Sequence, residues 1–181
     1  MSTIESASSR PGASEYAPYY ERYISLVQSA AESPDILATL NRQRRQTLLL
    51  LSGRTETDGD LRYAPEKWSV KEVLGHMNDT ERIMSYRALR IARGDATPME
   101  GFEQDDYVRN GPFERRPLAD LIEDYIAVRG ATLSLFCNLD EVAWTRRGMA
   151  NRNEVTVRAL AYIIAGHELH HRRILEEKYL R

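Results

Sequence analysis

Histidine is rare in this chain and concentrated at one place. Three of the four histidines, His167, His170 and His171, fall close to the C-terminus, and the fourth is His76. Neutral imidazole is the commonest protein ligand for transition metals, and side chains four residues apart on a helix project from the same face. The histidines therefore predict one metal-binding site.

The C-terminal segment carries an apolar seam with helical spacing, and two histidines lie on it. Alternate steps of three and four residues give Val157, Leu160, Ile164, His167, His171, Ile174 and Lys178. Two imidazoles in core positions need polar partners, and one divalent ion would supply both. Gly166 costs about 1 kcal/mol inside a helix, which predicts that a neighbouring element or ligand approaches closely there. His170 points about a third of a turn away, so we expect it behind the ligands or at the surface.

His76 falls in a second segment with helical spacing. The apolar stripe of that segment consists of Val70, Val73, Leu74, Met77, Met84, Ala88 and Ile91. His76 lies at the edge of the stripe, on the side shared with Thr80 and Arg87. A side chain at this edge can reach across to a neighbouring helix at the mouth of a cavity. The expected metal ligands are therefore His76, His167 and His171.

Helical periodicity dominates the rest of the chain. The expected helices span residues 15–31, 33–52, 69–93, 118–138 and 155–181. The second has a start signal in Ser33-Pro34-Asp35, with serine as N-cap and proline in the first turn. Gly53 and Gly94 are expected to end the second and third helices. One short and four long helices predict an all-α four-helix bundle with an extra short N-terminal helix.

Long connections separate the expected helices. Residues 54–67, 94–117 and 140–153 are predicted loops, the last with a short hairpin around Gly148. Loops longer than about a dozen residues are uncommon in compact domains and are often functional. The loop over residues 94–117 is therefore a candidate cover for the site. Its candidate covering side chains are Phe102, Asp105, Asp106 and Tyr107.

Composition favours one globular domain that binds neither nucleic acid nor membrane. The net charge is −2, which gives no electrostatic case for nucleic acid, and no apolar run approaches the roughly 20 residues that span a membrane. Residues 1–14 lack the apolar core of a secretory signal. We expect them to be a disordered lead to a single domain over residues 15–181 in the cytoplasm. The lone Cys137 has apolar neighbours and is expected to be a small core residue.

Two other metal motifs overlap the C-terminal histidines. The string from His167 to His171 matches the H-E-x-x-H of zincin proteases, but those enzymes need a downstream third ligand and a substrate-binding sheet that the sequence lacks. Glu168 and His171 match half of a di-iron bundle site. The other half would need a glutamate at position 73, which is valine. A mononuclear site with three histidines and an open position remains.

Longer motifs surround these histidines. They read WSVKEVLGHMNDTER over residues 68–82, YRALR over residues 86–90 and GHELHH over residues 166–171. In this order they resemble the DinB/YfiT-like superfamily, and the likeness covers nearly the whole chain from about Tyr16. The resemblance implies a four-helix bundle of up-down-down-up topology that is often dimeric. It also implies that His76, His167 and His171 hold the metal.

The resemblance implies an activity as well. Some family members are similar to metal-dependent transferases that use low-molecular-weight thiols such as bacillithiol or mycothiol, and one is a thiol-dependent maleylpyruvate isomerase. We therefore expect a thiol-dependent S-transferase acting on a small electrophile. The alternatives are a metal-dependent hydrolase with a metal-activated water and a non-catalytic bundle stabilised by the ion.

Several further expectations concern the site and the assembly. The ion is expected to be Zn²⁺, with Ni²⁺, Fe²⁺ or Mn²⁺ as alternatives, and a small thiol is the expected cosubstrate. Glu168, Asp79 and His170 are candidates for orienting the ligands. The tyrosine-rich residues 16–23 are expected to pack across the bundle or to help form a homodimer.

Overall fold

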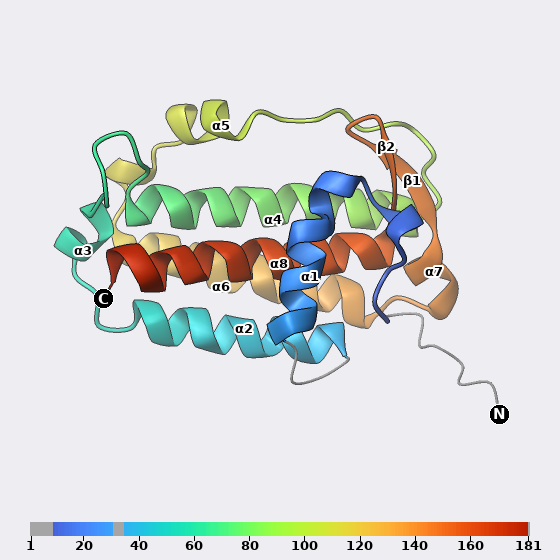
Figure 1. Ribbon diagram of the computed structural model, residues 1–181, viewed down its shortest axis with the longest axis horizontal. Helices are drawn as coiled ribbons and strands as arrows, with labels where there is room; N and C mark the ends of the chain where they lie inside the picture. The colour runs from blue at the N-terminus through green and yellow to red at the C-terminus, as the bar shows by residue number, and fades with distance from the viewer. Residues whose placement is uncertain (1–8, 31–34, 181) are drawn as a thin grey trace.

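Four long helices form the body of the structure, a computed structural model that describes residues 9–30 and 35–180. They are α2 (Ile36–Leu51), α4 (Val70–Ala92), α6 (Leu118–Cys137) and α8 (Val157–Ile174). Figure 1 shows α2 and α8 running in one direction and α4 and α6 in the other. Both α2 and α4 pack against both α6 and α8. The predicted all-α bundle of up-down-down-up topology is confirmed.

Side-chain caps explain where the long helices begin. The Asp35 carboxylate accepts a hydrogen bond at 2.9 Å from the backbone N–H two residues later, so Asp35 is the N-cap of α2. The prediction of Ser33 as that cap was wrong because Asp35 supplies the capping oxygen; Ser33 and Pro34 themselves lie outside the described residues. Ser69 caps α4 as predicted, in a reciprocal capping box with Glu72.

Short elements fill the connections. They are α1 (Glu21–Ala30), α3 (Glu56–Asp60), α5 (Gln104–Asn110), α7 (Glu141–Thr145), β1 (Arg147–Ala150), β2 (Asn153–Thr156), 3₁₀ turns over Ala13–Glu15, Pro18–Tyr20 and Phe113–Arg115, and a π turn over Leu175–Tyr179. The two predicted loops that follow α2 and α4 therefore contain short helices. The predicted hairpin is confirmed, with Gly148 opposite Val155 in antiparallel register. Gly53 and Gly94 follow α2 and α4 with φ of 72° and 78°, as expected of residues that end helices.

The N-terminal segment lies across the bundle. In Figure 1, α1 crosses α8 at a steep angle, and the two helices are in contact. Tyr16, Tyr23, Ile24 and Val27 are buried in this contact region, so the tyrosine-rich segment packs across the bundle as predicted. The homodimer remains a prediction. Of the expected disordered lead, residues 1–8 lie outside the described residues, and the 3₁₀ turn Ala13–Glu15 overlaps its end.

A polar layer divides the core. One apolar cluster joins α1 to the C-terminal part of α4 and the N-terminal part of α8, and a second occupies the other end of the bundle around Leu74 and Leu121. Buried polar side chains fall between the two clusters along the helices. They include His76, Thr80, Glu81, Arg129, His167 and Glu168. The functional argument concerns this layer.

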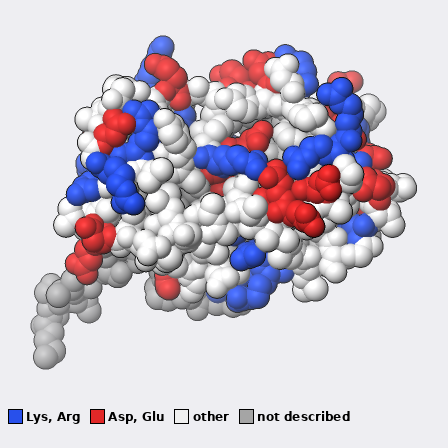
Figure 2. Space-filling model, turned by 180° about the vertical axis from the view of Figure 1, so that it is seen from behind, with Lys and Arg blue, Asp and Glu red and all other residues white. Residues whose placement is uncertain are grey.

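The surface is mixed in charge and has one exposed thiol. On the face shown in Figure 2, basic and acidic side chains adjoin and do not separate into large fields of one sign. Cys137 is exposed, which corrects the expectation of a core residue: Phe136 takes the buried position, and the next side chain turns about 100° away. Among the described residues, no helix has the length and apolar character needed to cross a membrane.

Candidate metal centre

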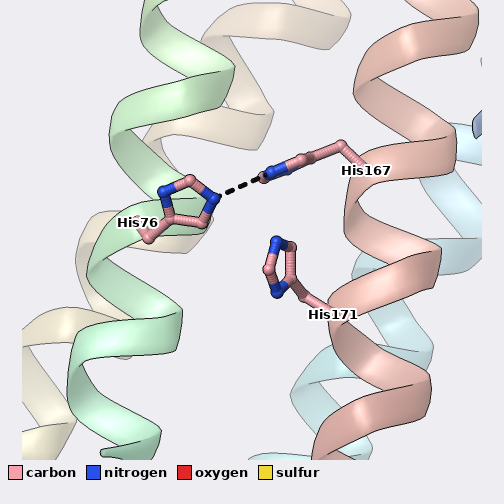
Figure 3. A group of neighbouring side chains, drawn as sticks. All are labelled: His76, His167 and His171. Atoms are coloured by element: carbon pink, nitrogen blue, oxygen red, sulfur yellow. Dashed lines mark hydrogen bonds between the residues drawn. The ribbon is translucent and has the colours of Figure 1, made fainter. Parts of the chain in front are cut away.

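Three histidines from two helices converge in the polar layer. His76 projects from α4, and His167 and His171 project from successive turns of α8, so that the three rings face one another (Figure 3). The Nε2 atoms of His76 and His167 are 3.0 Å apart, and one nitrogen of each ring lies within 4.8 Å of the others. Within the described residues, this is the one group of three or more His, Cys, Asp or Glu side chains with such spacing.

Burial keeps these rings neutral. His76 and His167 are 3% and 7% exposed, and His171 is partly buried. Burial, with a smaller effect from His170, lowers the pKa of His76 to about 4. Burial, reinforced by the neighbouring histidines, also holds the pKa of His167 and of His171 well below the ordinary value. Neutral imidazole is the form whose nitrogen lone pair binds a metal.

The donor set fits a divalent ion. Tetrahedral zinc with Zn–N bonds of about 2.0–2.1 Å places its ligand nitrogens about 3.3 Å apart, which is close to the separation between His76 and His167. Among the residues that the structure describes, no carboxylate or carbonyl forms a hydrogen bond with the three rings. Three converging lone pairs in a buried layer need a shared partner, and a metal ion is a partner that satisfies all three.

Cavities reach the histidines from two sides. One, of about 310 Å³, is lined by His76 and His167 together with residues of α1, α4 and the segment that precedes α5. The other, of about 320 Å³, is lined by His171, Trp68 and residues near the C-terminus. Asp105 of α5 lines both. The long connection therefore borders the site, and its role as a cover stays a prediction. Phe102 contributes to that border, whereas Asp106 pairs with Arg109 on the surface.

Gly166 permits the close crossing of α1 over α8. A Cβ atom at position 166 would overlap the backbone carbonyl of Tyr23. The Tyr23 ring then packs edge-on against His167, with 5.6 Å between ring centroids. The expected close approach at Gly166 is confirmed, and the approaching element is α1. The crossing places an aromatic ring against one of the three histidines.

The residues expected to orient the ligands are placed differently from one another. His170 lies beside the cluster, edge-on to His171 with 5.0 Å between ring centroids. Asp79 is half-buried and pairs with Arg82, and the contacts of Glu168 are with α2 and α6. Trp68, which sequence reasoning did not single out, has its ring 4.8 Å from that of His76. The orienting roles of His170, Asp79 and Glu168 stay predictions.

A buried ionic cluster adjoins the histidines and was not anticipated. Arg129 of α6 is 0% exposed; it donates to Glu81 through Nε at 2.8 Å and Nη2 at 2.7 Å, and it forms an ion pair with Glu168. Tyr125 and Thr47 donate to Glu168 Oε1 at 2.7 and 2.5 Å. The cluster therefore ties α6 to both helices that carry histidines. The available signal was a charged residue on the apolar face of α6.

Comparison with known proteins agrees with this architecture. The DinB superfamily matches residues 39–175, more than half of the chain. The chain belongs to the DinB superfamily. Among solved structures, it is similar to YfiT from Bacillus subtilis, with 14% identity, 91% of each chain covered and a TM-score of 0.69. YfiT is described as a probable metal-dependent hydrolase with an unusual four-helix bundle topology; the likeness shows the shared fold. No protein with a curated description matches in sequence.

Proposed function

We propose that this protein is a metal-dependent hydrolase whose divalent ion is held by His76, His167 and His171. The observation that carries the proposal is the convergence of three neutral imidazoles, with ring nitrogens within 4.8 Å of one another, beside a cavity. A divalent ion held there would lower the pKa of a coordinated water to about 7. The fold shared with YfiT, described as a probable metal-dependent hydrolase, supports water as the nucleophile.

The side chains around the histidines would fix their orientation. Trp68 packs against the ring of His76, and Tyr23 packs against the ring of His167. Each contact restricts rotation of a ligand ring, which favours one geometry at the ion. Because His76 comes from α4 and the other two ligands from α8, the ion would also fasten the two helices together. Both effects are properties of the chain and can be measured without a substrate.

Two alternatives use the same ligands. In a thiol-dependent transferase, a small thiolate replaces water as the nucleophile. In a non-catalytic bundle, the ion only fastens α4 to α8 and needs no open position. The cavity that reaches His76 and His167 favours an open position over a closed site. Among the described residues, no contact around the histidines favours sulfur over water, so thiol transfer remains the alternative.

The test begins with metal analysis of protein purified without a nickel column. We expect one divalent ion per chain, lost in His167→Ala and retained in His170→Ala, the matched control one helical turn away. The visible spectrum of a cobalt-substituted sample should change on addition of azide, because an open position admits an anion. A cobalt spectrum that does not change with azide or small thiols would contradict both the hydrolase and the transferase. Turnover of nitrophenyl esters that requires added thiol would replace the hydrolase with the transferase.

A further inference from the structure

One buried cation in the cavity beside the histidines has no anionic partner among the residues that the structure describes. Arg87 of α4 is 4% exposed. Its Nη2 donates to the carbonyl of Glu100 at 2.6 Å, its Nη1 lies 3.8 Å from Met84 Sδ, and its guanidinium lies over the Phe102 ring, 5.9 Å from the centroid. Arg87 forms no ion pair with any Asp or Glu that the structure describes. Buried charges in proteins are normally paired.

Arg87 shares the face of α4 that carries His76. The two residues are eleven positions apart, which is about three turns and about 16 Å along the axis, and both side chains line the same cavity. Arg87 Nη1 contacts Met84, one turn nearer the N-terminal end of α4, so the guanidinium lies on the side of Arg87 that faces His76. Thr80 lies between them on this face, and its buried hydroxyl has no hydrogen-bond partner among the described residues. The face thus offers a hydroxyl without a hydrogen-bond partner and a guanidinium without an anionic partner among the described residues.

The rest of the cavity suits an organic molecule with one negative charge. Tyr20, Tyr23 and Phe102 give it aromatic walls, and its volume of about 310 Å³ is that of a small-ligand site. Arg22, Glu103 and Asp105 also line it, but all three are exposed to solvent. Together these exposed groups carry one net negative charge, which disfavours a dianion such as a phosphate monoester and leaves a carboxylate as the better match for the buried guanidinium.

We propose that this cavity binds a small organic substrate whose carboxylate is received by Arg87, with its apolar part against the aromatic walls and its reacting bond toward the histidines. Calling the ligand a substrate rests on the proposed function. The carboxylate site itself stands on the cavity and the unpaired guanidinium. The same molecule without its negative charge should bind poorly, because it would leave the buried cation unmatched.

The test uses two probes of the same shape, 4-phenylbutyrate and its neutral amide, with titration calorimetry on the protein with and without added zinc. We expect the acid to bind on the order of tenfold more tightly than the amide, in line with a hydrogen bond to a charged group. Arg87→Met should remove that difference, and Arg87→Lys should retain part of it. Arg90→Met is the matched control, since Arg90 pairs with Asp95 outside the cavity. Phenyl phosphate should bind more weakly than the acid.

Thermal unfolding supplies a readout independent of activity. Without ligand, Arg87→Met should melt at the same temperature as the wild type or higher, because no buried carboxylate loses its partner. The acid should raise the melting temperature of the wild type and of Arg90→Met but not of Arg87→Met. Equal binding of acid and amide, tighter binding of phenyl phosphate, or a large loss of stability in Arg87→Met would each overturn the proposal.

Binding measured with and without zinc distinguishes a failure of the Arg87 site from a failure of the proposed function. If the acid binds only with zinc, and His167→Ala abolishes binding while Arg87→Met does not, the carboxylate binds the ion and the Arg87 site is wrong. That result would support the metal centre. If instead Arg87-dependent binding occurs in a protein that takes up no zinc, the carboxylate site stands and the proposed function fails.

Discussion

Two buried arginines of this bundle have different surroundings. Arg129 is enclosed by Glu81, Glu168 and the carbonyl of Leu40, so that its charge is fully matched by the fold. Arg87 is nearly as buried, yet its protein contacts are one carbonyl, one sulfur atom and an aromatic face. The first holds helices together. The second lines a cavity together with His76 and His167.

The two arginines lie in two chemically different parts of the polar layer. On one side of α8, Glu168 completes a closed set of ionic contacts. On the other side, the ring nitrogens of His76 and His167 face each other at 3.0 Å, and Arg87 lines a cavity without an anionic partner among the described residues. Burying polar groups without partners costs stability, and functional sites are where folded proteins commonly carry such a cost. The contrast between Arg129 and Arg87 therefore favours the histidine side of the polar layer as the functional site.

The largest loss of stability should come from breaking the ionic cluster of Arg129, Glu81 and Glu168. Arg129→Met leaves Glu81 and Glu168 buried without their cation, so we expect a loss of about 3–5 kcal/mol in the free energy of unfolding, measured by urea denaturation. Arg82→Met is the matched control, because Arg82 pairs with Asp124 at the surface, and exposed pairs contribute about 0–1 kcal/mol. Equal losses in the two variants would erase the contrast between the closed cluster and the surface.

Zinc bound by the three histidines should stabilise the protein. Zinc at one hundred times its dissociation constant should stabilise the wild type by about 2.7 kcal/mol through mass action, measured by denaturation with and without the metal. His171→Ala should abolish that gain, whereas His170→Ala should keep most of it. If His170→Ala proved the more damaging change, the assignment of ligands would be wrong.

The close crossing over the histidines should tolerate less change than the solvent face of the bundle. Gly166→Ala drives a methyl group into the carbonyl of Tyr23, and we expect a loss of about 1–3 kcal/mol from the overpacking. Gly130→Ala on α6 is the matched change, because a Cβ atom there meets no atom within 4 Å. It should stabilise the protein by about 0.5–1 kcal/mol through helix propensity. Denaturation of the two variants would show whether the signs differ.

Sequence periodicity predicted the histidine side better than the ionic side, for a physical reason. Spacing along one helix shows which side chains share a face, so the seam position of His167 and the shared edge of His76 and Arg87 were visible in the sequence. Which helices adjoin each other is not visible in that spacing. The pairing of Arg129 with Glu81 and Glu168 therefore required the structure.

Local sequence gave wrong predictions for the exposure of Cys137 and for the connections that contain α3 and α5. Cys137 has apolar neighbours in the chain, but Phe136 takes the buried position of this turn, so the thiol is exposed. Helices α3 and α5, of five and seven residues, are too short to show a helical period within loops. The capping signal of α4 succeeded because Ser69 and Glu72 act within a single turn. Local capping chemistry was thus readable where tertiary placement was not.

Glu15, near the N-terminus, is a second buried charge with protein partners, and its contribution to stability should depend on pH. Glu15 is 5% exposed and accepts hydrogen bonds from Arg158 at 2.5 and 2.7 Å, from Thr156 at 2.9 Å and from the backbone of Gly12 at 2.7 Å. Burial alone raises the pKa of Glu15, but these bonds outweigh it and lower that pKa below its ordinary value of 4.5. The stability that Glu15 contributes is therefore present above pH 4.5 and lost as the pH falls through the lowered value.

Glu15→Gln should cost about 1–2 kcal/mol at pH 7, somewhat less than the roughly 1.5–3 kcal/mol of a hydrogen bond to a charged group, because the amide keeps part of the hydrogen bonding. The difference between wild type and variant should shrink as the pH falls below 4.5 and through the lowered pKa of Glu15, because the wild-type carboxyl is then protonated and resembles the amide. Urea denaturation of both proteins across this range measures the difference directly. Glu154→Gln, at an exposed pair with Arg147, should change stability little at any pH. A Glu15→Gln difference that stayed constant from pH 7 to 3 would show that the glutamate acts through packing and not through its charge.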